Sequence, residues 1–133
     1  MNIGVLHPGE MGISIAASMI NSGHPVYWLS AYRSEKTRNR AEKHGLIETQ
    51  SLLAICKECE VILSVCPPHA AEEVAISVTN EGFAGRYLDA NAISPARARK
   101  IGRIIQDSGG TFIDGGIIGG PAWQPKSTWL YLS

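Results

Sequence analysis

The sequence lacks the features of a secreted, membrane-spanning or nucleic-acid-binding protein. No basic segment followed by an apolar segment opens the chain, and no apolar run approaches the length of a membrane span. The 12 basic and 12 acidic residues cancel, so there is no global field to attract nucleic acid or an anionic membrane. Only three cysteines are present, which argues against a disulfide framework and for a reducing compartment. We therefore expect a cytoplasmic protein with neither a membrane nor a nucleic-acid partner.

What the chain does have is an alternation of apolar strands and helical segments. Its 133 residues, 44% of them apolar, suffice for one domain with a core and are too few for two, so we expect one domain over residues 1–133. Most of the strands are apolar throughout, which is typical of a parallel sheet covered on both faces. The pattern predicts an α/β fold with a doubly wound, mainly parallel sheet. The predicted strands cover residues 2–6, 24–30, 60–65, 86–91, 111–114 and 127–133, and the predicted helices cover residues 11–22, 34–44, 49–59, 69–79 and 94–108. The expected helix N-caps are Ser34, Ser94 and either Thr49 or Ser51.

The first strand-to-helix turn, residues 4–12 (GVLHPGEMG), has the arrangement of a dinucleotide-binding turn. In doubly wound folds the pyrophosphate lies at this turn, against backbone N–H groups and the positive end of the helix dipole. Gly9 would let the backbone approach the phosphates, and Gly12 would let the helix pack closely on the first strand. His7 stands where the G-x-G-x-x-G pattern has its first glycine, and Pro8 favours an extended backbone before it. We expect His7 to continue the strand, partly buried and hydrogen-bonded to the backbone.

The end of the second strand, in residues 29–40 (LSAYRSEKTRNR), bears on the choice of cofactor. NAD-binding proteins usually carry an acidic residue there for the ribose hydroxyls. No carboxylate occupies the strand end of this chain, where Ser30, Arg33, Ser34 and Lys36 stand instead. An arginine suits a 2′-phosphate, which it can hold with two parallel N–H bonds. The pattern favours NADP over NAD; the alternative interpretation is a solvated basic helix start.

Three motifs, in this order, resemble the β-hydroxyacid dehydrogenases, a family that includes 3-hydroxyisobutyrate dehydrogenase and the NADP-binding domain of 6-phosphogluconate dehydrogenase. Residues 4–12 resemble the G-x-I-G-x-G-x-M-G opening of that family. Residues 61–74 (VILSVCPPHAAEEV) are similar to its strand-then-proline segment. Residues 87–120 resemble its D-x-S-T-x-x-P segment followed by its D-A-P-V-S-G-G substrate segment. The resemblance covers essentially the whole chain and implies a Rossmann NAD(P)-binding fold in an oxidoreductase.

The resemblance also implies, position by position, which residues bind. Those implied to lie along the cofactor pyrophosphate are Gly9, Glu10, Met11 and Gly12, and those implied to face the adenosine ribose are Ser30 and Arg33. The residues implied on the far side of the nicotinamide ribose are Val65, Cys66 and Pro67, with Asn91 near the nicotinamide and substrate. Ile118, Gly119 and Gly120 are implied to meet the substrate carboxylate. The implied ligands are NADP, with NAD less favoured, and a small hydroxyacid; a homo-oligomer is compatible with the resemblance.

The chain departs from the family pattern at three places. His7 replaces a glycine, Asn91-Ala92 replaces Ser-Thr, and Ile118 replaces the serine that would bond the substrate. The last change points to a substrate that is bulkier or less polar than the usual small hydroxyacids.

The family's catalytic lysine lies on a long helix after the sixth strand, and the chain ends before that helix. Lys126 precedes the last predicted strand and cannot replace it. Hydride transfer requires a positioned base for the hydroxyl proton, so we expect this chain to bind cofactor without catalytic residues of its own and without a C-terminal helical domain. The alternative is a catalytically silent nucleotide-binding module on the same fold. A methyltransferase is disfavoured because the acid at the end of the second strand is missing.

The cysteines of Cys56-x-x-Cys59 and Cys66-x-x-His69 have the spacing of zinc ligands. The predicted strand over 60–65 separates the two pairs, and at roughly 3.3 Å per residue it would hold Cys59 and Cys66 about 23 Å apart. One tetrahedral ion cannot bridge that distance. We therefore expect buried, inert cysteines and no metal site.

Two other features have structural explanations. The basic run over 97–103 (RARKIGR) has no interleaved aromatic residues and is interpreted as a solvated helix face. Trp123 and Trp129 are expected in the core or at an interface, such as the surface that a helical domain would cover.

Overall fold

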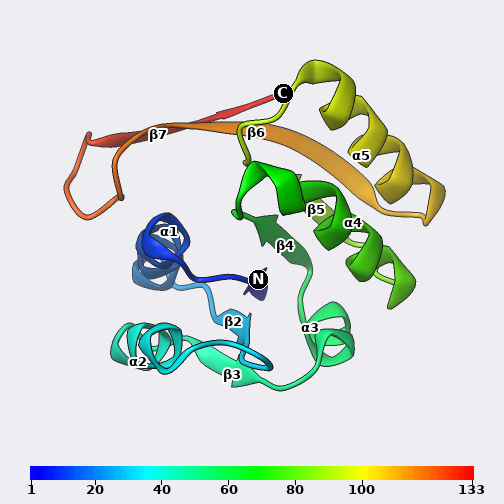
Figure 1. The fold of residues 1–133 in the computed structure, drawn as a ribbon. Coiled ribbons are helices and arrows are strands. Elements are labelled where there is room, and N and C mark those ends of the chain that lie inside the picture. The colour runs from blue at the N-terminus through cyan, green and yellow to red at the C-terminus, as the bar shows by residue number, and fades with distance from the viewer.

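Seven strands form a single twisted sheet in the computed structural model, which describes all residues from 1 to 133 (Figure 1). The strand order is β3-β2-β1-β4-β5-β6-β7; the first six strands pair in parallel, and β7 pairs antiparallel with β6. The predicted α/β fold with a mainly parallel, doubly wound sheet is therefore confirmed. The strands are β1 (Ile3–Val5), β2 (Val26–Leu29), β3 (Ile47–Thr49), β4 (Val61–Ser64), β5 (Arg86–Asp89), β6 (Thr111–Gly119) and β7 (Thr128–Leu132).

Helices cover both faces of the sheet, with α1 and α2 on one side and α3, α4 and α5 on the other (Figure 1). They are α1 (Glu10–Asn21), α2 (Glu35–Lys43), α3 (Leu52–Glu58), α4 (Ala71–Asn80), preceded by the 3-10 turn η1 (Pro68–Ala70), and α5 (Pro95–Asp107). Serine hydroxyls accept the backbone N–H three residues ahead at the starts of α2, α3 and α5, which confirms Ser34, Ser94 and Ser51 as N-caps. No helix of the structure combines the length and the apolar character that crossing a membrane requires.

The core has two layers, one on each face of the sheet. Trp28 is fully buried in the layer beneath α1 and α2, and Tyr87 is fully buried in the layer beneath α3, α4 and α5. Each central strand contributes to both layers because successive side chains point to opposite faces. The strands are apolar throughout for this reason.

The sequence prediction omits strand β3 and ends strand β6 too early. Strand β3 was not expected, because Ile47 and Glu48 are exposed and so leave no apolar signature; Thr49 ends this strand and does not begin a helix. Strand β6 extends to Gly119, five residues beyond the predicted end. Its second half is set by antiparallel pairing with β7, over which Gly115 lies opposite Leu132.

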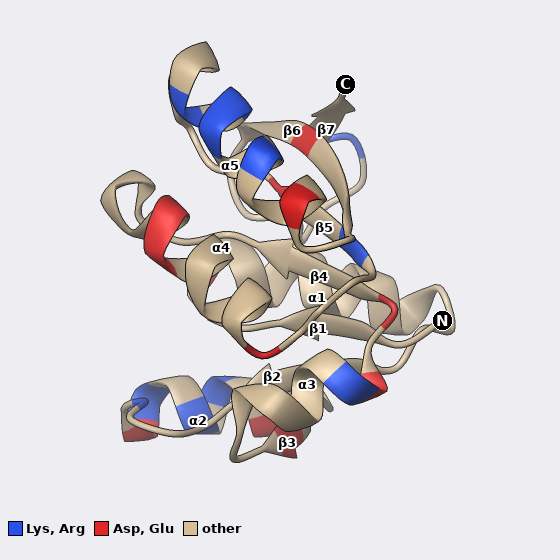
Figure 2. Ribbon diagram, turned by 90° about the vertical axis from the view of Figure 1, so that its right-hand side faces the viewer, with Lys and Arg blue, Asp and Glu red and all other residues tan.

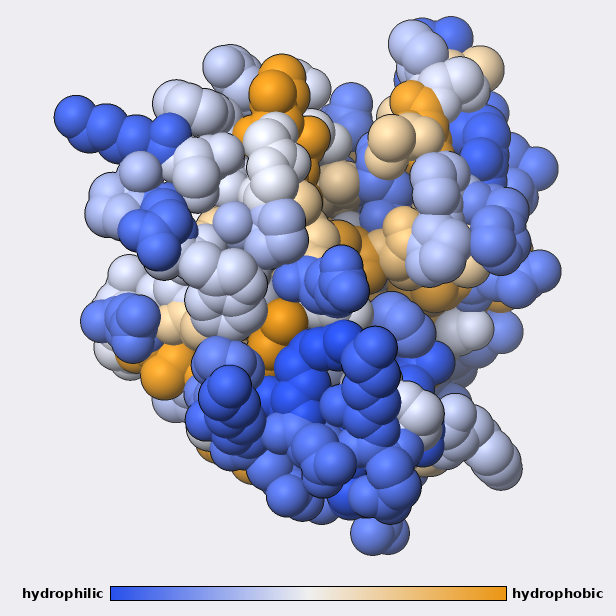
Figure 3. Space-filling view, turned by 60° about the vertical axis from the view of Figure 1, so that its left-hand side comes forward, coloured by the Kyte–Doolittle hydropathy of each residue, from blue (hydrophilic) through white to orange (hydrophobic).

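The basic run lies on α5, on the face away from the sheet (Figure 2). Arg99 and Arg103 are exposed, and Lys100 forms an ion pair of 2.8 Å with Glu72 of α4. Arg97 donates to the carbonyl oxygen of Pro68 over 2.8 Å. The run is thus a solvated helix face, as expected, and it contacts α4 at Glu72 and the preceding turn η1 at Pro68. The exposed side of α2 is likewise hydrophilic (Figure 3).

The two tryptophans near the C-terminus lie outside the core. Trp123 is 48% exposed and its ring centroid lies 4.8 Å from that of His44 at the end of α2. Trp129 lies on β7 and is 51% exposed. Of the two expected positions, the core is therefore excluded for both: Trp123 lies in the segment before β7, and Trp129 lies on β7, an edge strand with no layer packed on it. The interface position stays a prediction.

Candidate functional site

Two adjoining hollows lie where the carboxyl ends of β1, β2 and β4 meet, the point at which the strand order reverses. The larger cavity has a volume of about 340 Å³ and extends between the end of β2 and the first turns of α4. The second, which we call the turn groove, has a volume of about 290 Å³ and runs along the turn between β1 and α1. The two share four lining residues: His7, Val65, Cys66 and Pro67. In open α/β sheets, ligands bind at this edge.

The start of α1 lines the turn groove. Gly9 is the N-cap, and its carbonyl oxygen accepts the N–H of Ile13 over 2.8 Å to begin the helix. The N–H groups of the three residues between them have no acceptor within the helix and are available to an anion. A Cβ atom on Gly9 would lie 3.7 Å from the His7 ring, an ordinary contact, so packing against the protein does not require glycine there. The missing side chain leaves the groove open.

Gly12 has a different role. A Cβ atom on it would lie 2.8 Å from the carbonyl oxygen of His7, which is too close. Helix α1 therefore lies directly against the turn only because residue 12 has no side chain. This is the close packing that the glycine pattern predicts.

His7 is partly buried, as predicted, but differs from the prediction in two other respects. Strand β1 ends at Val5, so His7 does not continue the ladder, and no hydrogen bond of its ring to the backbone is present. The half-buried ring instead lines both hollows. Burial, followed by the charges of Arg33 and Arg40, lowers the pKa of His7 below its ordinary value of 6.5. The imidazole is therefore neutral at pH 7 and lies in a positive field.

Two arginines produce that field. Arg33 lines the larger cavity, and its Nε is buried without a hydrogen-bond partner. Arg40 donates from Nη1 to the carbonyl oxygen of Pro8 over 3.2 Å, which ties α2 to the turn. Neither arginine forms an ion pair in the structure. An unpaired, partly desolvated guanidinium is a ready partner for a phosphate.

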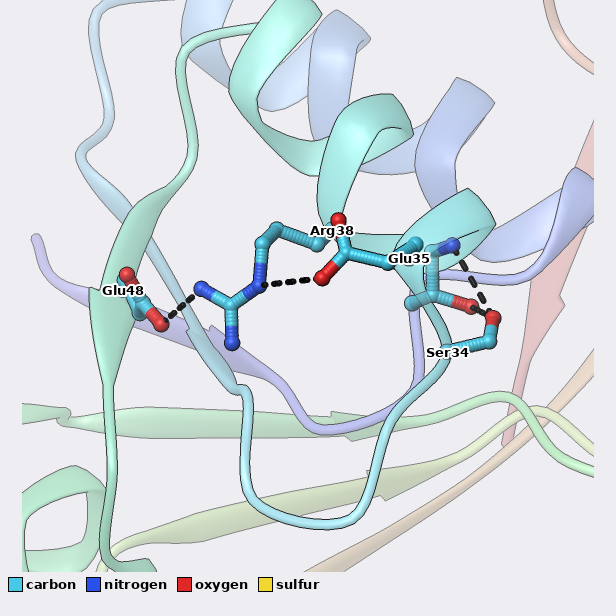
Figure 4. Close-up of polar contacts among 5 residues, drawn as sticks. Ser34, Glu35, Arg38 and Glu48 are labelled. Atoms are coloured by element: carbon cyan, nitrogen blue, oxygen red, sulfur yellow. Dashed lines mark hydrogen bonds and ion pairs between the residues drawn. The ribbon is translucent and has the colours of Figure 1, made fainter.

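Two carboxylates that follow Arg33 in the sequence, Glu35 and Glu48, pair with another arginine. Arg38 pairs with Glu48 of β3 and, at 3.8 Å, with Glu35 (Figure 4). Its guanidinium also lies 5.9 Å from the centre of the Trp28 ring. The hydrogen bond from Arg38 lowers the pKa of the Glu48 carboxyl. Glu48 is an acid that the sequence prediction missed, because it stands on the unpredicted β3. Its pairing with Arg38 leaves the charge of Arg33 free.

The other expected contacts at the end of β2 have structural partners. Ser30 is buried, and its hydroxyl donates to the carbonyl oxygen of Thr49 over 3.2 Å, so it does not line the cavity. Ser34 caps α2, and Lys36 is exposed on the outer side of that helix. Arg33 itself follows a tight turn in which its N–H donates to the carbonyl oxygen of Ser30 over 3.1 Å.

The two hollows share a wall, which consists of Val65, Cys66 and Pro67. Asn91 lies behind this wall and lines neither hollow: its Oδ1 accepts the N–H of Cys66 over 2.7 Å. Burial raises the pKa of the Cys66 thiol, so it is neutral at pH 7. Burial likewise raises the pKa of Cys56 to about 11 and that of Cys59 to about 12.

Ile118, Gly119 and Gly120 line neither hollow. Ile118 is 60% exposed on the β6–β7 hairpin, and Gly119 has a φ of +116° where the chain begins to leave the strand. Lys126 is exposed in the loop before β7. The structure thus brings together the glycine turn, Arg33 and the wall after β4 around the two hollows, and the expected substrate segment does not line them.

Comparison with known proteins agrees with this geometry. Residues 2–129 match the family model of the NAD binding domain of 6-phosphogluconate dehydrogenase. The chain belongs to that family. It is therefore a nicotinamide-dinucleotide-binding domain of the hydroxyacid dehydrogenase type with a Rossmann fold, and the family resemblance predicted from the three motifs is confirmed.

Individual relatives match between 90% and 98% of this chain with part of their own length. An uncharacterized oxidoreductase of Bacillus subtilis, YkwC, is 29% identical over 95% of the chain and 45% of its own length. A probable mitochondrial 3-hydroxyisobutyrate dehydrogenase of Dictyostelium discoideum is 25% identical over 98% of the chain and 41% of its own length. A solved protein of unknown function, described as structurally similar to 3-hydroxyacid dehydrogenases, superposes with a TM-score of 0.82 at 29% identity, over 90% of the chain and 45% of its own. The chain spans less than half the length of these relatives.

Proposed function

We propose that the chain binds NADP in preference to NAD, and that a protein containing it transfers a hydride between the nicotinamide and a hydroxyacid. The observation that carries the cofactor preference is the side chain of Arg33. Its Nε is buried at the larger cavity with no partner, at the end of β2, where NAD-binding proteins usually carry a carboxylate. A buried donor without an acceptor costs free energy, which an incoming 2′-phosphate would recover.

The charged side chains around the two hollows, which together we call the cleft, support the same preference for NADP. Burial, followed by the charges of Arg33 and Arg40, lowers the pKa of His7, so both guanidinium groups lie close enough to act on the junction of the two hollows. Glu73 of α4 is the only acidic residue that lines the larger cavity. NADP carries a net negative charge concentrated on its phosphates, so the field favours it over NAD by the additional phosphate.

Each part of the cleft has a role in this proposal. The free N–H groups at the start of α1 bind the pyrophosphate, the guanidinium of Arg33 binds the 2′-phosphate, and the wall of Val65, Cys66 and Pro67 excludes water from the opposite side. NADP supplies the nicotinamide ring that accepts or releases the hydride. The proton of the substrate hydroxyl needs a base, and the side chains around the two hollows that could accept a proton are the neutral imidazole of His7 and the carboxylates of Glu10 and Glu73.

The test is a pair of calorimetric titrations of this chain, one with NADPH and one with NADH. The proposal requires NADPH to bind at least roughly tenfold more tightly, the factor that about 1.4 kcal/mol represents. Equal affinities would reject the 2′-phosphate contact, and no binding of either would reject the dinucleotide site. In a protein that contains this chain, NADPH binding without hydroxyacid turnover would favour the alternative of a catalytically silent nucleotide-binding module.

A further inference from the structure

A buried set of hydrogen bonds ties β4 to β5 behind the wall of the cleft. The side chain of Asn91 accepts the N–H of Cys66 at Oδ1 over 2.7 Å and donates from Nδ2 to the hydroxyl of Ser64 over 3.0 Å. The backbone N–H of Asn91 donates to Oδ1 of Asp89 over 2.9 Å. Ser64, Asp89 and Asn91 are all at least 93% buried, so these bonds are shielded from water.

The position of these bonds is where the sheet itself stops holding the two strands together. Ser64 and Asp89 are the last paired residues of β4 and β5, and the N–H of Ala90 still donates to the carbonyl oxygen of Ser64 over 3.1 Å. Beyond that point the N–H of Cys66 has no strand to pair with. The amide of Asn91 therefore replaces the missing ladder bond, one residue into the wall of the cleft.

The amide of Asn91 supplies both an acceptor and a donor without a charge. Serine has a single oxygen and a shorter reach, and an ionised aspartate could accept the N–H of Cys66 but would bury a charge. Asp89 holds the backbone of Asn91 from beneath, while its Oδ2 has no partner. The hydrogen bonds therefore form a chain that links Asp89 to Asn91 and Asn91 to Cys66 in the wall.

We propose that Asn91 is a positioning residue that fixes the wall of Val65, Cys66 and Pro67 before the dinucleotide binds. The proposal rests on the proposed function, because the wall matters for binding only if the two hollows take the cofactor. Asn91 itself touches neither hollow, so its contribution is to preorganise the wall and not to contact the ligand. Removing the amide frees the N–H of Cys66 and lets the wall relax into the cleft.

The experiment compares Asn91→Ala with Asn80→Ala, a matched change at an exposed position at the end of α4. Amide hydrogen exchange, followed by NMR residue by residue, reports the Cys66 N–H directly, and calorimetry reports NADPH affinity. In Asn91→Ala we expect exchange at Cys66 to rise about tenfold or more while the amides of Ile62 and Leu63 in β4 keep their protection. We expect the NADPH dissociation constant to rise by about tenfold, as for a lost buried hydrogen bond.

Several outcomes would overturn the inference. Unchanged exchange at Cys66 would show that Asn91 does not hold the wall, and faster exchange at Cys66 with unchanged NADPH affinity would make the bond structural only. Faster exchange throughout β4 in Asn91→Ala would reveal general destabilisation. In that case Asn91→Ser, which keeps a small polar group, is the second variant. If Asn91→Ser also lost protection throughout β4, a local role of Asn91 would be rejected. Failure of the unaltered chain to bind NADPH would instead reject the proposed function, while the Cys66 amide would still report whether Asn91 fixes the wall.

Discussion

The carbonyl oxygen of His7 occupies the space in which a side chain on residue 12 would begin. A Cβ atom on Gly12 would lie 2.8 Å from that oxygen. The oxygen also accepts the N–H of Gly9 over 2.8 Å, so it cannot move away without opening the turn. Helix α1 and the glycine turn are thus held at a distance that only glycine permits.

Gly12→Ala is therefore expected to lower both the stability and the cofactor affinity of the chain. The added methyl group must push α1 away from the backbone of the turn, and overpacking of this kind typically costs about 1–3 kcal/mol. The displacement also moves the free N–H groups that bind the pyrophosphate. Urea unfolding and calorimetric titration with NADPH measure the two effects.

Gly9→Ala is the matched control for that change, since its Cβ would make only an ordinary 3.7 Å contact with the His7 ring. We expect a smaller loss of stability than for Gly12→Ala but a clear loss of NADPH affinity, because the methyl group narrows the turn groove. If the two variants lost stability equally, the close approach of Gly12 to His7 would not be the reason for the glycine.

Arg33→Ala should reduce NADPH affinity much more than NADH affinity. Loss of a charge-assisted contact with the 2′-phosphate is worth about 1–3 kcal/mol, or roughly tenfold to more than a hundredfold in the dissociation constant. NADH has no phosphate at this position, so its affinity should change little. Calorimetric titration with both cofactors gives the comparison.

The control for the arginine prediction is Arg38→Ala. Arg38 lies on the same helix side of the sheet but is paired with Glu48 and Glu35 and lines neither hollow. Arg38→Ala should therefore leave the ratio of the NADPH and NADH affinities unchanged. Equal losses for NADPH and NADH in Arg33→Ala would count against the 2′-phosphate contact.

The stability of the chain should depend on the protonation of His7. Burial and the two neighbouring arginines hold its folded pKa below the ordinary 6.5. Between 6.5 and that lower value, the unfolded chain takes up a proton that the folded chain refuses, so the free energy of unfolding falls on acidification. His7→Asn does not titrate and should lose less stability over this interval. Parallel urea unfolding at pH 7 and pH 5 tests this; identical pH dependence in both proteins would contradict it.

Asp89 should give the opposite pH dependence. Burial raises its folded pKa above the ordinary 3.8, against the hydrogen bonds from Asn91. The folded chain therefore keeps the proton that the unfolded chain loses, so this contribution to stability is present below pH 3.8 and disappears as the pH rises through the folded pKa. Asp89→Asn keeps an acceptor for the N–H of Asn91 and does not titrate. Its stability relative to the unaltered chain should improve as the pH rises above about 4, and a difference that is constant with pH would refute the assignment.

The sequence allowed most elements to be predicted because their signals are local. Serine N-caps, glycines after helices and uninterrupted apolar runs mark α2, α5, β4 and β5 without reference to the rest of the chain. Strand β3 escaped prediction because Ile47 and Glu48 are exposed at the edge of the sheet, and the length of β6 depends on its pairing with β7. Both depend on a partner strand that no local pattern encodes.

For the site, the sequence by itself determined the glycine turn, the basic end of β2 and the proline segment after β4, because parallel strands bring their carboxyl ends to one edge. Only the tertiary structure decided what each side chain does there. The hydroxyl of Ser30 is taken by Thr49 of β3, and the amide of Asn91 by Cys66 and Ser64 of the neighbouring chain segment. A buried polar group takes whichever partner the packing places within reach, and those partners lie at least 19 residues away in the sequence.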